Sequence, residues 1–176
     1  MRRAGQAPYR RCPVNSASGV MKPQLREAQG VDYVAVAGWI YADASTVHNA
    51  ALKIPLPILI AELQYRIQAE GGKSFGMLLG EDLIAFGQYS VPSPGEVHFV
   101  RLIVSPGFRR KGYGRSLCTE LIEHAVADTG ARVHTMRVDR DNIAGRNLCA
   151  SFGFQVVSAE SDTKTLFLRR MHRTAE

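Results

Sequence analysis

The chain has 176 residues, 45% of them hydrophobic, and this length and composition suit one globular domain with a sizeable core. No apolar run approaches the roughly 18–20 residues needed to cross a bilayer, which excludes a transmembrane helix and predicts no membrane partner. The formal net charge of +6 is of the kind that nucleic-acid-binding proteins carry, but its position along the chain argues against that class.

The excess positive charge lies mostly in the first 20 residues, which contain four arginines and no acidic residue. Of the 22 lysines and arginines, the remaining 18 stand against 16 acidic residues, so the rest of the chain has a net charge of only +2. The segment lacks the apolar core of a secretory signal, and we expect residues 1–21 to form a disordered basic N-terminal extension. Met21 is an alternative start, and a nucleic-acid-binding arm is the alternative function of the extension.

The three cysteines of the chain are Cys12, Cys118 and Cys149. They are odd in number, far apart in the sequence and without metal-ligand spacing. Structural disulfides are rare in reducing compartments, and isolated cysteines of this kind are typical of a protein kept reduced. We therefore expect free thiols, a cytoplasmic location and no metal site.

The first part of the remaining chain predicts one short strand followed by two helices. The strand covers residues 23–28, and the first helix covers residues 31–43, with Asp32 as a candidate N-cap residue. The second helix covers residues 57–70 and ends at two consecutive glycines, which favour a helix C-terminus.

The middle of the chain predicts three strands. Residues 73–80 and 83–91 form a hairpin, and residues 96–104 form the next strand after a Ser-Pro-Gly turn. Regular alternation along residues 96–104 places His98 on the same face as Leu102.

The last part of the chain predicts helices and strands in alternation. In chain order these are a helix, a strand, a second helix and two final strands, at residues 112–128, 132–138, 143–152, 154–159 and 163–170. The helix at 112–128 has one apolar stripe at helical spacing and ends at a glycine. The complete order of elements predicts a single α/β domain over residues 22–172, built on a mixed sheet.

A basic, glycine-containing stretch stands where a strand is followed by a helix. Arg109, Arg110 and Lys111 precede Gly112 and Gly114. A helix N-terminus has unpaired backbone N–H groups and the positive end of the helix dipole, and glycines there allow a phosphate to approach closely. The alternative is a turn shaped by the glycines with solvated cations, because short glycine patterns recur by chance.

Two motifs in this sequence resemble those of the GNAT superfamily of N-acetyltransferases. The stretch RRKGYG, residues 109–114, is similar to the family pattern [RQ]-x-x-G-x-[GA], and it follows RLIVSPGF. About thirty residues later, NIAGRNLCASFGF, residues 142–154, is similar to N-x-x-A-x-x-L-Y-x-x-x-G-F. Four residues of this second motif match at the family spacing: Asn142, Leu148, Gly153 and Phe154. The order of elements over residues 22–170 also agrees with the family.

The resemblance implies a GNAT fold, in which the fourth and fifth strands of a mixed central sheet splay apart and helices cover both faces. It implies that the pantetheine arm of acetyl-CoA, the expected cosubstrate, lies between these strands. The backbone of the fourth strand would pair with the arm, one N–H of this strand would stabilise the developing oxyanion, and the amides of residues 110–115 would hold the pyrophosphate. The implied cofactor-binding residues are Leu102, Ile103, Val104, Arg109, Arg110, Lys111, Gly112, Tyr113, Gly114, Arg115 and Asn142.

The resemblance also implies a reaction without a metal. The acetyl group passes to a primary amine by direct attack on the thioester through a tetrahedral intermediate. Where the family usually has a tyrosine, the presumed acid for the leaving thiolate, this chain has Cys149. Cys149 could donate the proton, could be a passive packing residue, which we favour, or could mark an acyl-CoA-binding module with weak or no catalysis.

The candidates for the general base are Glu96 and His98, because family bases often come from the fourth strand. The unperturbed pKa of histidine suits proton abstraction, while the competing interpretation is a hydrogen-bonded strand histidine without a catalytic role. We expect Glu96, at the start of the strand, to be solvated.

The sequence does not identify the acceptor beyond a small-molecule or peptide amine. In family members that acetylate protein N-termini, a glutamate stands five residues before the motif asparagine, where this chain has Arg137. Four polar residues of the expected acceptor loops could attract a cationic amine, although ordinary loop polarity is the interpretation we prefer: Asp43, His48, Glu160 and Asp162. Dimers are common in the family, so a homodimer is compatible with the resemblance.

Overall fold

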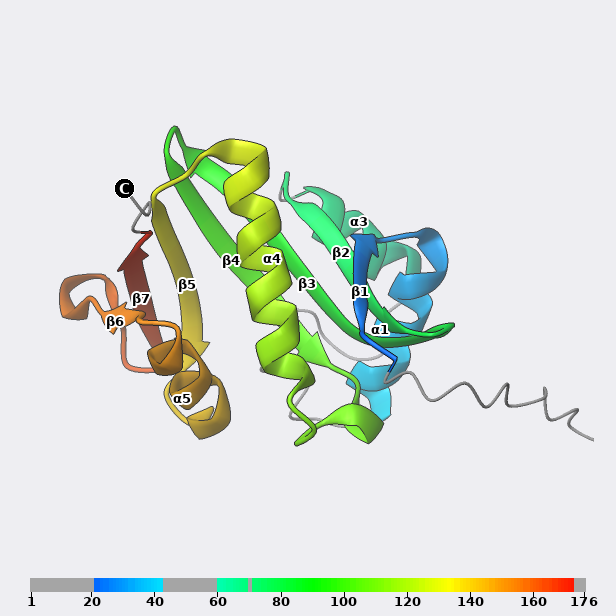
Figure 1. Ribbon diagram of the computed structural model, residues 1–176. Coiled ribbons are helices and arrows are strands. Elements are labelled where there is room, and N and C mark those ends of the chain that lie inside the picture. The colour runs from blue at the N-terminus through cyan, green and yellow to red at the C-terminus, as the bar shows by residue number, and fades with distance from the viewer. Residues whose placement is uncertain (1–20, 43–59, 70, 173–176) are drawn as a thin grey trace, which may run out of the picture.

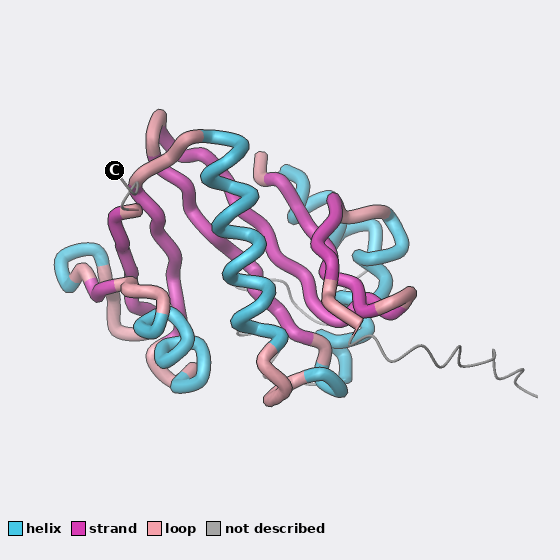
Figure 2. Tube along the Cα trace, viewed as in Figure 1, coloured by secondary structure: helices cyan, strands magenta, loops and turns pink. Residues whose placement is uncertain are grey.

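The structure is a computed structural model that describes residues 21–42, 60–69 and 71–172. Within these ranges every predicted helix and strand is present, in the predicted order (Figures 1 and 2). In chain order the elements are β1 (Gln24–Glu27), α1 (Gly30–Ala42), α3 (Ile60–Ala69), β2 (Lys73–Leu79), β3 (Asp82–Ser93), β4 (Glu96–Val104), η1 (Pro106–Phe108), α4 (Tyr113–Thr129), β5 (Val133–Asp139), α5 (Ile143–Ser151), β6 (Gln155–Val156), η2 (Ser158–Glu160) and β7 (Thr165–Met171).

The strands form one seven-stranded sheet in the order β1-β2-β3-β4-β5-β7-β6. All neighbouring strands are antiparallel except β4 and β5, which are parallel. A parallel pair needs a crossover connection, and α4 supplies it between β4 and β5. The predicted mixed α/β sheet is therefore confirmed.

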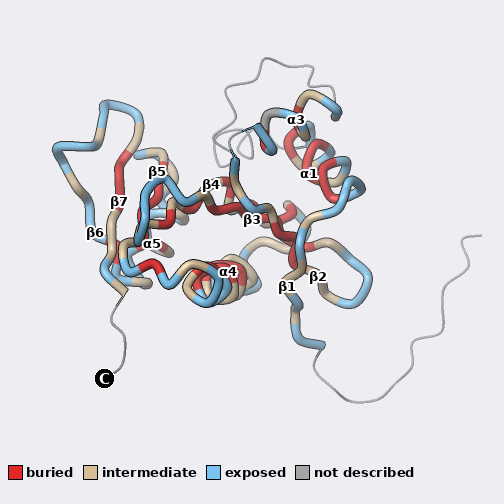
Figure 3. The backbone as a smooth tube through the Cα atoms, turned by 90° about the horizontal axis from the view of Figure 1, so that it is seen from above, coloured by how far each residue is buried: buried red, intermediate tan, exposed pale blue. Residues whose placement is uncertain are grey.

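Helices cover both faces of the sheet, as Figure 3 shows from above: α4 lies on one face, and α1 and α3 lie on the other. The predicted apolar stripe of α4 is buried in the core. Four of its five predicted members, Leu117, Leu121, Ile122 and Ala125, are buried, and the fifth, Val126, is half-buried against the same core. The helix ends at Gly130, whose φ of 65° is in the left-handed region, and whose N–H donates to the carbonyl of Val126. The opposite face has its own core, in which Phe86 and Ile103 of the sheet pack against α1 and α3.

Asp32 is not the N-cap of α1, which corrects the sequence prediction. The helix begins at Gly30, two residues earlier, and the Asp32 carboxylate accepts a hydrogen bond of 2.7 Å from the backbone N–H of Gln29. This is the backward-reaching bond that an acidic residue of the first helical turn makes in a capping box. The same carboxylate forms two bonds with the Arg26 guanidinium, at 2.6 and 2.9 Å, so it also ties α1 to β1.

Several expectations fall partly or wholly outside the described ranges. Residues 1–20 of the extension expected at 1–21 lie outside these ranges, as do the first residues of the helix predicted at 57–70. Of the strand predicted at 154–159, only Gln155–Val156 pairs with β7. None of the helices in the described ranges is long and apolar enough to cross a membrane.

His134 is a titratable group in the core. Its side chain is fully buried, packs edge-on against Phe99, and has its Nε2 atom 3.2 Å from the carbonyl oxygen of Ala131. Burial, with Arg170 as a further cause, lowers the pKa of His134 to about 4 from an ordinary value of 6.5. The native state therefore takes up this proton less readily than the unfolded chain.

We predict that His134 makes the protein less stable in acid. Above pH 6.5 both states are neutral at this residue, and as the pH falls toward about 4 only the unfolded state gains the proton, so stability is lost across this window. Urea unfolding midpoints measured from pH 8 to 4 should fall less steeply in His134→Gln than in the wild type. Identical slopes in the two proteins would contradict the prediction.

Candidate active site

The parallel ladder between β4 and β5 is short. It pairs Glu96–Phe99 with Val133–Met136, whereas β4 continues to Val104 and β5 continues to Asp139. Figure 1 shows the two strands close together at their N-terminal ends and apart at their carboxyl ends. The second half of β4 thus remains paired with β3 along one edge, whereas its other edge has no ladder with β5.

A β-bulge interrupts β4 where the two strands separate. Val100 pairs with Gln88 and Ile103 pairs with Phe86, so β4 has one extra residue between these pairs, and Arg101 there has a left-handed φ of 55°. The extra residue changes which side chains of β4 point to which face of the sheet. Phe99 and Leu102 both pack on the α4 side, where regular alternation would separate them.

The bulge also overturns the prediction that His98 shares a face with Leu102. His98 precedes Phe99 in the regular part of the strand and therefore points to the face opposite α4. Beyond the bulge, Leu102 packs against the core formed with α4, and Ile103 packs against the core formed with α1 and α3.

The side chain at the bulge is a buried arginine. Nη1 of Arg101 donates a 2.6 Å hydrogen bond to Oε1 of Gln88, and Nε2 of Gln88 donates a 2.9 Å bond to the carbonyl of Ile67 in α3. These two bonds connect the strained position in β4 to the helix that covers this face. Left-handed backbone at a non-glycine residue persists only when the surrounding structure holds it, and these contacts contribute to that support.

The turn that leads from β4 into α4 contains two left-handed residues. Arg110 has a φ of 62°, and Gly112, the N-cap of α4, has a φ of 87°. Glycine adopts this conformation without the steric penalty of a Cβ atom. Alternating left- and right-handed residues turn successive backbone N–H groups toward one side and form a concave anion site. The N-terminus of a 17-residue helix adds its positive dipole end.

The side chains of this basic turn are fixed by nearby groups. Nε of Arg109 donates to the carbonyl of Val104 at 3.1 Å, and Nζ of Lys111 donates to the carbonyl of Gly107 at 3.0 Å. The backbone N–H of Arg115 donates to the carbonyl of Gly112 at 3.0 Å. The first amides of the turn are therefore better candidates for holding an anion than the amide of Arg115.

The second half of α5 lies against the start of α4. Asn142 is the N-cap of α5, and its Oδ1 accepts a 2.8 Å bond from the N–H of Gly145. A Cβ atom at Gly114 would lie 3.5 Å from Leu148 of α5 and 3.7 Å from Val104 of β4. The fold thus brings the two sequence motifs together near the carboxyl ends of the separated strands. The backbone N–H of Asn142 itself donates to the carbonyl of Asp139 at 3.0 Å, and the expected bond from Asn142 to a cofactor stays a prediction.

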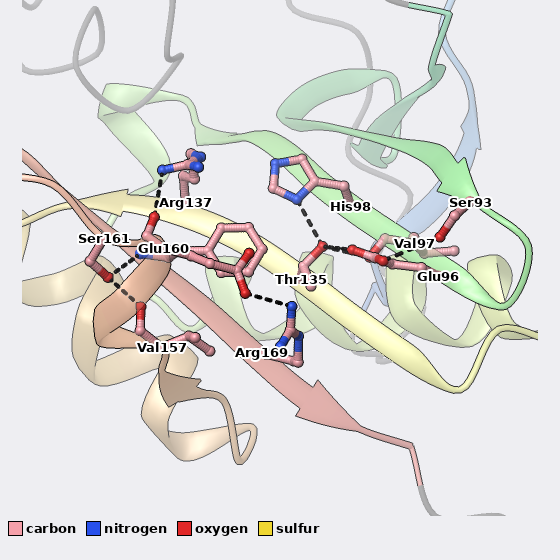
Figure 4. A network of polar contacts seen from close by, with 11 residues as sticks. Ser93, Glu96, Val97, His98, Thr135, Arg137, Val157, Glu160, Ser161 and Arg169 are labelled. Atoms are coloured by element: carbon pink, nitrogen blue, oxygen red, sulfur yellow. Dashed lines mark hydrogen bonds and ion pairs between the residues drawn. The ribbon is translucent and has the colours of Figure 1, made fainter.

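A polar network lies on the sheet face opposite α4, across β4 and β5 (Figure 4). Nδ1 of His98 is 2.9 Å from Oγ1 of Thr135, and that hydroxyl donates to Oε1 of Glu96 at 3.1 Å. Glu96 is half-buried and also accepts a bond from Ser93, which corrects the expectation that it is solvated. Burial, followed by the charge of Arg137, lowers the pKa of His98, while Glu96 acts in the opposite direction.

The His98 ring stacks on Phe167 of β7. The ring centroids are 6.1 Å apart and the ring planes differ by 8°. The guanidinium groups of Arg137 and Arg169 lie 5.0 and 5.6 Å from the centre of the same phenyl ring. Oε1 of Glu160 accepts a 2.8 Å bond from Arg169. Three strands therefore contribute to one site around an imidazole in a fixed orientation.

A match to a family model shows which protein family has this arrangement of strands and helices. The model of the acetyltransferase (GNAT) family matches residues 41–154, which include the separated strands, the basic turn and the start of α5. The chain belongs to the GNAT acetyltransferase family. No curated protein matches the chain at a significant level.

Solved structures of N-acetyltransferases have the same fold as this GNAT acetyltransferase. Spermidine N-acetyltransferase from Vibrio cholerae, in complex with CoA and spermine, superposes with a TM-score of 0.71 at 13% identity over 85% of this chain and 95% of the other. The PaiA N-acetyltransferase from Thermoplasma acidophilum, in complex with CoA, gives 0.67 at 16% identity over 86% and 100%. The putative acetyltransferase YncA from Salmonella typhimurium, with acetyl-CoA, gives 0.65 at 21% identity over 85% and 93%.

Cys149 of this acetyltransferase is buried in the core on the α4 side of the sheet. Its thiol donates to Sδ of Met136 at 3.1 Å, and burial raises the pKa of Cys149 to about 11. A thiol that is buried and held protonated in this way is a packing group. The geometry favours the passive interpretation over proton donation by Cys149.

The polar residues expected in the acceptor loops have structural partners where the structure describes them. Asp162 accepts hydrogen bonds from the backbone N–H groups of Lys164 and Thr165 and from the Thr165 hydroxyl. Glu160 pairs with Arg169, as described above. Asp43 and His48 lie outside the described residues. Among residues 21–42, 60–69 and 71–172, no cluster of histidine, cysteine, aspartate and glutamate is arranged to hold a metal ion.

Sequence reasoning did not identify Thr135, Phe167 or the bulge at Arg101 as parts of this site. Thr135 and Phe167 belong to strands predicted correctly, but the sequence does not give the register that places them beside His98. Arg101 carried a usable signal, because a charged residue inside the apolar stretch HFVRLIV is unusual for a buried strand.

We predict that Cys149→Ala keeps the rate of acetyl transfer near that of the wild type. The variant should lose about 1 kcal/mol of unfolding free energy, because it removes a buried sulfur and its contact with Met136. Steady-state rates and urea unfolding of the two proteins measure both effects. Loss of turnover with unchanged acetyl-CoA affinity would show that the thiol takes part in the reaction.

Proposed function

We propose that this acetyltransferase transfers the acetyl group of acetyl-CoA to a primary amine by direct attack through a tetrahedral intermediate. The observation that carries the proposal is the end of the β4–β5 ladder at Phe99 and Met136, which leaves β4 without a β5 partner up to Val104, beside Gly114 at the start of α4. An extended ligand can pair with an edge of β4 that its parallel neighbour has left. The proposed location is the cytoplasm, in agreement with the free thiols of Cys118 and Cys149.

The residues present fit the chemistry of CoA. The pantetheine arm offers amide groups that suit pairing with the backbone of Leu102–Val104. The pyrophosphate suits the left-handed turn at Arg110 and Gly112, where backbone N–H groups, the helix dipole and cationic side chains come together. The bound cosubstrate supplies the thioester, and the protein supplies orientation and the route for the proton.

His98 is the proposed general base for the acceptor amine. Its lowered pKa keeps the imidazole neutral at pH 7, which is the form that accepts a proton. Its ring lies on the face opposite α4, and the bulge at Arg101 separates this side chain from the backbone proposed to bind the pantetheine arm. Glu96 interacts with His98 through Thr135 and is therefore a supporting group.

The proposed acceptor is a small-molecule or peptide amine. The similar structure from Vibrio cholerae is a spermidine N-acetyltransferase, and this supports a small amine as the first acceptor to test. Steady-state release of free CoA across a panel of amines measures the reaction. Binding of acetyl-CoA without CoA release for any amine would favour the alternative, an acyl-CoA-binding module without catalysis.

We predict that Gly112→Ala weakens acetyl-CoA binding. Alanine at the φ of 87° introduces strain of about 1–2 kcal/mol and moves the N–H groups of the turn. Gly130→Ala at the other end of α4 is the matched control, because its φ of 65° is also left-handed but lies away from the turn. Calorimetric titration should show weaker binding for Gly112→Ala and wild-type affinity for Gly130→Ala. Equal affinities in both variants would exclude the turn as the pyrophosphate site.

We predict that His98→Ala lowers kcat by about 10²–10⁴-fold, the contribution typical of a positioned general base. The acid limb of the pH–rate profile should disappear, and the affinity for acetyl-CoA should stay unchanged, because His98 is on the face opposite α4. Rates measured from pH 5 to 9 at saturating acetyl-CoA provide the test. A variant with the wild-type rate and acid limb would remove His98 from the mechanism.

A further inference from the structure

Thr135 lies between the two ionisable candidates of the active site. It is the register partner of His98 in the parallel ladder, and Glu96 is two residues before His98 on the same strand. Residues at this spacing share a face, so the two side chains of β4 flank the Thr135 hydroxyl of β5. The hydroxyl is 2.9 Å from Nδ1 of His98 and 3.1 Å from Oε1 of Glu96.

The chemistry of the three groups fixes the direction of the hydrogen bonds. A threonine hydroxyl has one proton, and an ionised carboxylate is only an acceptor. The hydroxyl has two acceptors within reach, Oε1 of Glu96 at 3.1 Å and the carbonyl oxygen of Val97 at 3.4 Å, and its proton points to the nearer, charged one. With its only proton given to one of these acceptors, the oxygen of Thr135 accepts from His98. Nδ1 of His98 must carry the hydrogen, which leaves Nε2 of the neutral ring with its lone pair.

The surroundings of the ring hold this orientation. The imidazole is stacked on Phe167, and its Nδ1 edge points toward Thr135. Figure 4 shows the second ring nitrogen on the side away from Thr135. The charged groups around the ring are Glu96 on its own strand, Arg137 on β5, and Arg169 on β7 with its partner Glu160 from η2.

We propose that Thr135 is a positioning residue that fixes His98 in the Nδ1–H tautomer and couples it to Glu96, so that Nε2 is presented as the base. The proton of the acceptor ammonium passes to Nε2, the N–H bond of the amine breaks, and the neutral amine keeps the electron pair for attack. The Nδ1 proton stays in place, and Glu96 stabilises the imidazolium through the Thr135 hydroxyl. The coupling to catalysis rests on the proposed function, whereas the tautomer does not depend on it.

The tautomer is tested by ¹⁵N-detected histidine NMR of the full chain above pH 7. The expected result for the wild type is a protonated Nδ1 and an unprotonated Nε2 on His98. Thr135→Ser keeps the hydroxyl and should keep this tautomer. Thr135→Val removes the hydroxyl and should give a mixture of the Nδ1–H and Nε2–H tautomers of His98. An Nε2–H tautomer in the wild type would overturn the inference, and this result needs no variant to fold and no substrate to be known.

The coupling is tested by pH–rate profiles of the same proteins. Thr135→Val should lose on the order of tenfold in kcat, with its acid limb moved to lower pH, because the imidazolium loses its acceptor at Nδ1. Thr135→Ser should restore both toward the wild type, and Thr119→Val on α4 is the matched control. A Thr135→Val enzyme with the wild-type rate and acid limb would overturn the coupling. Absence of transfer to any amine would instead count against the proposed function and leave the NMR result valid.

Discussion

The active site depends on the point at which the parallel ladder of β4 and β5 ends. The two strands pair over only four residues each, Glu96–Phe99 with Val133–Met136. The other edges of the same two strands pair further, since β3 pairs with β4 as far as Val104 and β5 pairs with β7 along the whole of Val133–Asp139. Where two neighbouring strands in the middle of a sheet stop pairing, the backbone N–H and C=O groups along the unpaired edge require other hydrogen-bond partners. The proposed role of the pantetheine arm follows from this requirement.

The bulge at Arg101 gives the two halves of β4 different tasks. Before the bulge, Glu96 and His98 face the side opposite α4 and form the polar network with Thr135. After the bulge, the backbone of residues 102–104 lies beyond the ladder with β5, close to the start of α4. One additional residue thus places a candidate base and a candidate cofactor-binding edge next to each other on a single strand. Without the extra residue, regular alternation would put His98 and Leu102 on the same face.

The sequence predicts the elements of this fold well because their signals are local. The stripe of α4 and the glycine at its end, for example, are properties of neighbouring residues, and both agree with the structure. The position of Asp32 was predicted wrongly, because an acidic residue near a helix start can act either as the N-cap or in the first turn. The choice depends on its contact with Arg26 of β1, which the local sequence does not show.

The site is harder to predict than the fold because it depends on register. His98 and Glu96 are candidates from the sequence because of their residue types and their strand. Thr135, by contrast, becomes important only when the parallel register places it opposite His98. The bulge is invisible to an argument from regular alternation, which treats every strand residue alike.

Cys149 and His98 differ as candidate reacting groups because their side chains have different chemistry and different hydrogen-bonded partners. Cys149 is buried and His98 is half-buried, and burial shifts the pKa of each in the direction that favours its neutral form. For a histidine this favours the form that accepts a proton, and in the proposed mechanism the Thr135 hydroxyl with Glu96 stabilises the charged form. For a cysteine it produces an inert thiol, whose nearest polar partner is the weak acceptor Sδ of Met136. Burial therefore has opposite chemical consequences for the two groups, and their different hydrogen-bonded partners support His98 rather than Cys149 as the candidate reacting group.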